Sequence, residues 1–187
     1  MKELVDGALD GRDCSFFVYG QTGSGKTHTI TGSDKESGVV QLSMAHIDRV
    51  KKSIPDLKIM ISSFEVYKEQ IYDLLGKQGY NKPLKISEKL AGGGFEISGL
   101  SEVEVSSLEE MVQVLSNADH QRHFAETYLE HLSSRSHMGF RIYLTQHAKK
   151  GSVTFIDLAG CEKIKAYSES ARSTDFGQSC SPARNIE

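Results

Sequence analysis

The stretch Gly20-Gln21-Thr22-Gly23-Ser24-Gly25-Lys26-Thr27 decides the fold, because it fits the phosphate-binding pattern G-x-x-x-x-G-K-[ST] without a mismatch. It follows a short apolar run, residues 14–19, that predicts a buried strand, and it precedes a plausible helix. A strand, a glycine-rich loop and a helix in that order are the context this motif requires. The alternative is a merely flexible Gly/Ser loop.

The residue types in this stretch suit the binding of a nucleoside triphosphate. The glycines let backbone N–H groups come close to phosphate oxygens. Lys26 would bring a positive charge to the β- and γ-phosphates, and the hydroxyl of Thr27 is suited to bind Mg²⁺. Residues 20–27 are therefore predicted to hold a nucleoside triphosphate.

Composition bounds the class of protein. The chain has 187 residues and a formal net charge of −3, so no basic field favours nucleic acid or an anionic membrane as a partner. We find no secretory leader pattern and no apolar run long enough to span a bilayer. Three cysteines without zinc-type spacing, Cys14, Cys161 and Cys180, are most simply free thiols in a reducing compartment. We expect a cytosolic protein.

The apolar pattern predicts an α/β fold. Helices are expected at 1–8, at the phosphate loop, at 39–52 and at 106–125, the last with the apolar stripe Leu108, Met111, Val112 and Leu115. Strands are expected at 16–19, 57–67, 71–75, 140–145 and 153–156, with hairpins in 84–105 that turn at 91–94 and 98–99 and a further turn at 147–151. Residues 168–182 are Ser-rich and weakly patterned, and they are predicted to be a loop or disordered. We expect a mixed sheet, centrally parallel near the nucleotide, between helices on both faces.

A second phosphate-related motif ends the last expected strand. Asp157-Leu-Ala-Gly160 places an acid where it can hold the Mg²⁺ shell, and a glycine whose N–H can reach a γ-phosphate oxygen. Alone, this D-x-x-G pattern is equally consistent with an ordinary turn at a strand end. Its place after the phosphate loop strengthens the reading as a nucleotide switch.

With a third motif, the chain resembles the kinesin motor domain. The resemblance rests on four segments in the family's order: 19–27 (YGQTGSGKT), 63–75 (SFEVYKEQIYDLL), 133–137 (SSRSH) and 157–162 (DLAGCE). It covers nearly the whole chain and implies a partial motor domain over 1–187, a P-loop NTPase. Its parts would be the phosphate loop at 20–27, switch I at about 127–137 and switch II at about 157–187.

The resemblance also implies roles for single residues. Ser134 looks like the switch I serine near Mg²⁺ and the γ-phosphate, Thr27 and Asp157 like metal-side residues, and Gly160 like the γ-phosphate sensor. Arg135 and Glu162 look like the ion pair that closes the switches, although they could be unrelated surface charges. His28 occupies a position that lies beside adenine in similar motors. His137 could equally be a packing residue.

The implied activity is that of a microtubule-stimulated ATPase. Such a protein would bind ATP and Mg²⁺, hydrolyse ATP and couple hydrolysis to microtubule binding and movement, in the cytoplasm on the cytoskeleton. A guanine-recognition stretch of the Asn-Lys-x-Asp type is absent from the sequence, which disfavours a small GTPase. The alternative is a catalytically weak nucleotide- or tubulin-binding module derived from a motor head.

Three departures from the family bear on that alternative. Glu130 stands where the family usually has Asn, and a carboxylate there would repel the γ-phosphate unless it points away or is protonated. Cys161 stands where Ser is more common. Nothing matches the family's Arg-x-Arg-Pro-like adenine clamp, and residues 183–187 resemble only the start of the tubulin-docking helix. We therefore expect a fragment with an unpaired sheet edge and exposed apolar surface. Basic residues in the loop 163–182, namely Lys163, Lys165 and Arg172, could face acidic tubulin or simply be solvated.

Overall fold

The structure is a computed structural model that describes residues 1–33, 35–88, 94–127 and 135–161. The helices are α1 (Lys2–Leu9), α2 (Lys26–Thr31), α3 (Val39–Ser53) and α4 (Leu108–Glu126). The strands are β1 (Asp13–Val18), β2 (Lys58–Tyr67), β3 (Gln70–Asp73), β4 (Lys85–Glu88), β5 (Phe95–Ser98), β6 (Val103–Val105), β7 (His137–Gln146) and β8 (Lys149–Asp157). A short 3₁₀ turn covers Gly79–Asn81. The expected order of helices and strands is confirmed.

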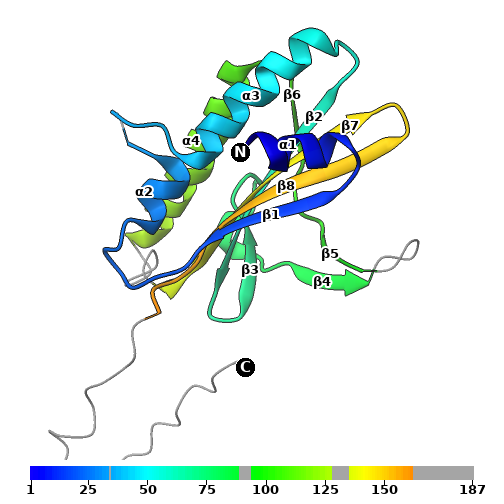
Figure 1. Cartoon of the computed structure of the whole chain (residues 1–187). Helices are drawn as coiled ribbons and strands as arrows, with labels where there is room; N and C mark the ends of the chain where they lie inside the picture. The colour runs from blue at the N-terminus through cyan, green and yellow to red at the C-terminus, as the bar shows by residue number, and fades with distance from the viewer. Residues whose placement is uncertain (34, 89–93, 128–134, 162–187) are drawn as a thin grey trace, which may run out of the picture.

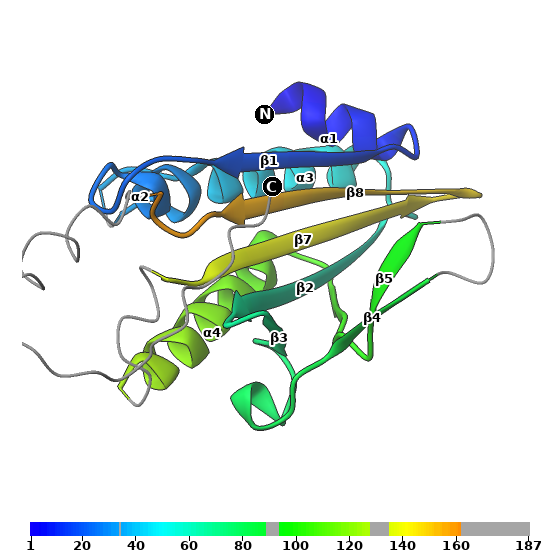
Figure 2. The ribbon, with the colours of Figure 1, turned by 90° about the horizontal axis from the view of Figure 1, so that it is seen from below.

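One mixed sheet forms the centre of the molecule (Figure 1). Its strand order is β1-β8-β7-β2-β3, and β6 pairs with β2 as well. The β1–β8 pair is parallel and the other pairs are antiparallel. The mixed sheet is thus confirmed, and its parallel pair carries both phosphate-related motifs at its end. The strands β4 and β5 form a separate hairpin (Figure 2).

The described helices cover one face of the sheet. The helices α1, α2, α3 and α4 lie on the same side of the sheet (Figures 1 and 2). Their side chains share a single core with the inward-facing residues of the strands. That core is rich in Val, Ile, Leu, Met and Phe, and its fully buried members include Val5, Val40, Met44, Ile47, Ile59, Ile61, Met111, Ile142 and Val153. The expectation of helices on both faces is met on one face only within the described residues.

Strand β1 corrects another expectation. Its apolar sequence predicted a buried strand, but its residues alternate between exposed and half-buried, because β1 lies at the edge of the described sheet and pairs only with β8. Phe17 is 64% exposed and Tyr19, just beyond the strand, is 74% exposed. The predicted unpaired edge and exposed apolar side chains are therefore present at β1.

Two turns also differ from the sequence prediction. We expected a second hairpin around 98–99, but β6 pairs with β2 instead of with β5. We expected a turn over 147–151, but only His147 and Ala148 separate β7 from β8. His147 takes the left-handed backbone conformation that so tight a connection requires, with φ of 54°.

Helix α4 begins with a side-chain cap at Ser107, a residue type that favours this position. The side chain of Ser107 accepts a hydrogen bond from the backbone N–H of Glu110 at 3.2 Å. The Glu110 carboxylate in turn accepts from the N–H and hydroxyl of Ser106, and these bonds lower the pKa of Glu110. Val112, expected in the buried stripe, is 42% exposed.

Within the described residues, no helix is both long and apolar enough to cross a membrane.

Candidate nucleotide site

The phosphate loop connects the end of β1 to the start of α2. Gly23 and Gly25 have φ of 78° and 88°, a left-handed conformation that a side chain would strain. The ammonium group of Lys26 donates a 2.9 Å hydrogen bond to the backbone oxygen of Gln21, across the loop. The side chain of Lys26 therefore bridges the two ends of the loop.

A cavity of about 310 Å³ adjoins this loop. It is lined by Thr22, Gly23, Gly25, Lys26, Thr27, His28 and Gly160. The structure thus brings five of the eight predicted phosphate-loop residues together with Gly160, which comes from the far end of the described chain, whereas Gly20, Gln21 and Ser24 do not line the cavity. A larger cavity, of about 490 Å³, has no residue in common with the phosphate loop and lies between β3, β4 and the turn after β5.

Thr27 and Asp157 meet beside this cavity. The Thr27 hydroxyl donates a 2.6 Å hydrogen bond to Oδ2 of Asp157, whose side chain is buried. The contact follows from strand pairing, because β1 and β8 run parallel with Val18 opposite Asp157. A hydroxyl and a carboxylate are the oxygen ligands that suit Mg²⁺, which completes its shell with water and phosphate oxygens. This donor set fits the predicted metal side of the site.

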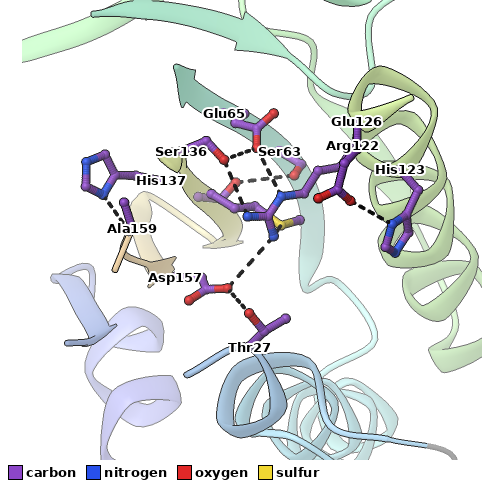
Figure 3. A network of polar contacts seen from close by, with 12 residues as sticks. Thr27, Ser63, Glu65, Arg122, His123, Glu126, Ser136, His137, Asp157 and Ala159 are labelled. Carbon is purple, nitrogen blue, oxygen red and sulfur yellow. Dashed lines mark hydrogen bonds and ion pairs between the residues drawn. The ribbon is translucent and has the colours of Figure 1, made fainter. Parts of the chain in front are cut away.

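A buried arginine links Asp157 to the rest of the sheet (Figure 3). Arg122, on α4, lies 3.8 Å from Oδ2 of Asp157 and donates from Nε to Oε1 of Glu65 at 3.0 Å. The hydroxyl of Ser136 donates to the same Glu65 oxygen at 2.5 Å. Glu65 is fully buried and Arg122 is 6% exposed. A chain of polar contacts therefore runs from Thr27 through Asp157 and Arg122 to β2.

Burial dominates the electrostatics of Glu65. Removal of its carboxyl group from water raises the pKa of Glu65, although the hydrogen bond from Ser136 and the charge of Arg122 act in the opposite direction. Its second oxygen, Oε2, is buried and has no hydrogen-bond partner among the described residues. Because no donor reaches Oε2, a negative charge on this oxygen would not be stabilised by a hydrogen bond, which agrees with the raised pKa of Glu65.

Sequence reasoning assigned no role to this arginine and glutamate. Glu65 lies within the strand expected at 57–67, and Arg122 lies within the helix expected at 106–125. One signal was present for Glu65, because Ile59, Ile61 and Glu65 lie on the same face by the two-residue period of a strand. A carboxylate on the core side of a strand demands a partner. Nothing in the local sequence of α4 identifies Arg122 as that partner.

Backbone contacts hold the segment after Asp157. The backbone N–H of Ala159 donates to Nδ1 of His137 at 3.0 Å, and the N–H of Cys161 donates to the backbone oxygen of Gly20 at 3.2 Å. A hydrogen bond between the side chains of Tyr19 and Cys161 raises the pKa of Tyr19. The 157–161 segment thus contacts both the start of β7 and the start of the phosphate loop.

The remaining predicted residues divide into two groups. Arg135 is described and exposed, and His28 lines the cavity with a half-exposed side chain 3.8 Å from Glu36. Ser134, Glu162 and Glu130 lie outside the described residues, as do Cys180 and the expected loop at 168–182. The predicted ion pair between Arg135 and Glu162 therefore stays a prediction, because only Arg135 is described.

Comparisons with known proteins agree with the motifs and the fold. A family model described as the kinesin motor domain matches residues 1–180. Similar proteins include kinesin-like protein KIF18A of Mus musculus, 39% identical over 175 residues, and kinesin-like protein KIF18B of Gallus gallus, 37% identical over 174 residues. Kinesin-like protein KIN-7N of Arabidopsis thaliana is 36% identical over 174 residues.

The three alignments cover 87% of this chain and 19–21% of the relatives, so the chain spans about a fifth of their length. A match over residues 1–180 includes the phosphate loop, both strands of the parallel pair and the Asp157–Gly160 segment. With its phosphate loop beside Asp157 on a mixed sheet, and with these relatives, the chain belongs to the kinesin family and has the P-loop NTPase fold of its motor domain.

Proposed function

We propose that this chain binds Mg·ATP in the 310 Å³ cavity and hydrolyses it as the nucleotide-binding part of a microtubule-stimulated motor. The observation that carries the proposal is the 2.6 Å hydrogen bond between Thr27 and Asp157 at the edge of that cavity. It joins the end of the phosphate loop to the acid of the second motif. Two oxygens placed in this way suit one Mg²⁺ beside the phosphates.

The residues of the loop would divide the work of binding. The backbone N–H groups of 20–27 would surround the phosphates, and Thr27 and Asp157 would hold the metal side. Lys26 now donates to the oxygen of Gln21, and we expect it to exchange that carbonyl for a phosphate oxygen. A hydrogen bond between two charged groups is stronger than one to a neutral carbonyl, so the exchange is favourable.

Hydrolysis would use groups that position water and stabilise charge, because phosphoryl transfer involves little covalent work by the protein. The N–H of Gly160 would contact the γ-phosphate from the cavity wall. Ser134 would reach the metal and γ-phosphate region, and Arg135 and Glu162 would close the site as an ion pair. These last roles rest on the match of 133–137 and 157–162 to the kinesin pattern. Thr27 and Asp157 would hold Mg²⁺, whose positive charge would offset that of the phosphates.

The partner in this proposal is tubulin, and the place of action is the microtubule cytoskeleton of the cytoplasm. The relatives are named kinesin-like proteins, and this chain spans about a fifth of their length. Movement along the microtubule is therefore proposed for the protein as a motor and not for residues 1–187 alone. A catalytically weak binding module is the second candidate, and it is favoured by the carboxylate of Glu130 in place of the family's usual Asn.

Binding can be tested by titration with a fluorescent ATP analogue in the presence of Mg²⁺. Lys26→Ala should abolish measurable binding, because it removes the main cation near the β- and γ-phosphates. Lys82→Ala is the matched control, since Lys82 lines the larger cavity and its loss changes the net charge equally. Equal affinity of Lys26→Ala and the unaltered chain would refute the proposed site.

Release of phosphate, measured with and without microtubules, then separates the two candidates. A motor enzyme should release phosphate faster when microtubules are added. A binding module should bind nucleotide or microtubules and show no such acceleration.

A further inference from the structure

His137 connects the two segments that the proposed switches are built from. It is the first residue of β7 and the last of the Ser-Ser-Arg-Ser-His segment, and its Nδ1 accepts the backbone N–H of Ala159 at 3.0 Å (Figure 3). Ala159 lies between Asp157 and Gly160. The side chain therefore joins the start of β7 to the segment that lines the nucleotide cavity.

The hydrogen bond between Ala159 and His137 fixes backbone that lies beyond the last paired residues of the sheet. The β7–β8 ladder ends with Met138 opposite Asp157, and no strand pairing among the described residues reaches Ala159. His137 precedes Met138, and its ring reaches past the ladder to the second residue after Asp157. Without this contact, the backbone of 158–160 would have to be ordered by other means, at a cost in conformational entropy.

A second tether lies on the other side of Gly160. The N–H of Cys161 donates to the oxygen of Gly20 at 3.2 Å, so the amides on both sides of Gly160 are bonded. The amide of Gly160 itself has no hydrogen-bond partner within the described part of the chain. Gly160 is also a wall residue of the 310 Å³ cavity. The arrangement fixes the neighbours of this one amide and leaves its own donor available.

We propose that His137 is a positioning residue, whose Nδ1 holds Ala159 so that the free amide of Gly160 stays at the wall of the nucleotide cavity. The inference rests on the proposed function, because it takes the terminal phosphate of a nucleotide as the group that Gly160 meets. A backbone N–H can only donate, so Nδ1 carries the lone pair and Nε2 carries the proton of a neutral ring. A donor held in place before the ligand arrives needs no reorganisation when charge develops.

Three variants separate the acceptor from the bulk of the ring. His137→Asn places Oδ1 at the same number of bonds from the backbone as Nδ1 and keeps an acceptor there. His137→Phe keeps an aromatic ring and removes the acceptor. His137→Gln keeps an amide oxygen but places it one bond further out. If the acceptor Nδ1 holds Ala159, His137→Asn should match the unaltered chain in amide exchange and nucleotide affinity. His137→Phe and His137→Gln should both lose the contact and give similar values.

The first readout needs no nucleotide. Hydrogen exchange of the Ala159 amide, followed by NMR in the full chain, should be about fivefold faster in His137→Phe and His137→Gln and unchanged in His137→Asn. Fivefold is the size expected for the loss of one neutral hydrogen bond. The amide of Phe155, inside β8, serves as the internal reference for global stability in every variant. Two results would overturn the proposal, with each rate taken relative to that of the Phe155 amide. One is an Ala159 exchange rate in His137→Phe equal to that of the unaltered chain. The other is an Ala159 exchange rate that is equally fast in His137→Asn and His137→Phe.

The second readout is discrimination between a slowly hydrolysed Mg·ATP analogue and Mg·ADP, which differ by the terminal phosphate. His137→Phe should lower the affinity for the analogue about fivefold, leave that for Mg·ADP unchanged, and be rescued by His137→Asn. Equal losses for both nucleotides would overturn the positioning role. If the unaltered chain binds neither nucleotide, the proposed function fails, whereas the exchange of Ala159 still tests the tether.

Discussion

The Thr27 hydroxyl donates a 2.6 Å hydrogen bond to Oδ2 of Asp157, although 130 positions separate the two residues in the sequence. Parallel pairing of β1 with β8 produces this contact, because it brings the ends of both strands to the same edge of the sheet. The bond lies where a nucleotide's metal would be held, between the phosphate loop and the acid that follows β8. Strand pairing is therefore what brings these two side chains together.

Replacement of Thr27 should separate the metal contribution from the rest of nucleotide binding. Thr27→Val keeps the shape of the side chain and removes the oxygen, so the gain in affinity that Mg²⁺ provides should fall about 10- to 100-fold. Thr27→Ser keeps the hydroxyl and should retain that gain. Titrations of the fluorescent analogue in Mg²⁺ and in EDTA would measure it. An undiminished Mg²⁺ effect in Thr27→Val would show that Thr27 is not a metal-side residue.

Loss of Arg122 should destabilise the fold strongly. Arg122→Leu leaves the buried Glu65 and Asp157 without their cation, which typically costs about 3–5 kcal/mol of unfolding free energy. The double variant Arg122→Leu/Glu65→Leu removes the partner charge as well and should be less unstable than Arg122→Leu alone.

Urea denaturation would give these free energies of unfolding. Arg49→Leu is the control, because Arg49 is an exposed arginine on α3 and its loss should change stability by less than about 0.5 kcal/mol. A double variant as unstable as the sum of its two single variants would show that Glu65 and Arg122 are energetically independent.

Local sequence predicted much of this fold because several elements carry their own signals. The glycines and the Lys-Thr pair identify the phosphate loop, and the helix expected at 39–52 agrees with α3 to within one residue at its end. The start of α4 was marked by serines followed by acidic residues, which the Ser107 cap explains. These signals depend on neighbours in the chain, so a sequence displays them.

Features that depend on distant partners could not be read in the same way. An apolar strand such as β1 has the same sequence at the centre or the edge of a sheet, so the exposure of Phe17 could not be predicted. The partner of β6 is β2, which lies about 40 residues earlier, and no turn signal encodes that choice. The pairing of Arg122 with Glu65 is likewise a product of packing α4 on the sheet.

The close contact of Gly139 with Phe64 predicts a site that tolerates no side chain. The two residues are opposite one another on β7 and β2, and a Cβ atom at Gly139 would overlap the Phe64 ring. Gly139→Ala should therefore destabilise the fold by about 1–3 kcal/mol in urea denaturation. Phe64→Leu should recover part of that loss when combined with Gly139→Ala. No recovery in the double variant would locate the strain elsewhere than at the ring.

The raised pKa of Glu65 predicts how stability changes with pH. Its carboxyl group is buried, so the folded chain keeps the proton at pH values where the unfolded chain has lost it. Between the ordinary value of 4.5 and the raised pKa, the folded state binds more protons, and its stability therefore falls as pH rises. The slope due to this one group is at most about 1.4 kcal/mol per pH unit, and above the raised pKa it vanishes.

Urea denaturation at steps from pH 4.5 to 8, for the unaltered chain and for Glu65→Gln, isolates this slope. Glutamine does not titrate, so the stability of the unaltered chain relative to Glu65→Gln should decline with pH and then level off. Replacement of the protonated carboxyl group by an amide adds a constant offset between the two curves, which leaves the slope unaffected. Burial raises the pKa of Asp119 as well, but Asp119 is present in both proteins, so its contribution cancels in this comparison. A relative stability that is flat or rises over this range would show that Glu65 is ionised in the folded chain, held so by Arg122 and Ser136.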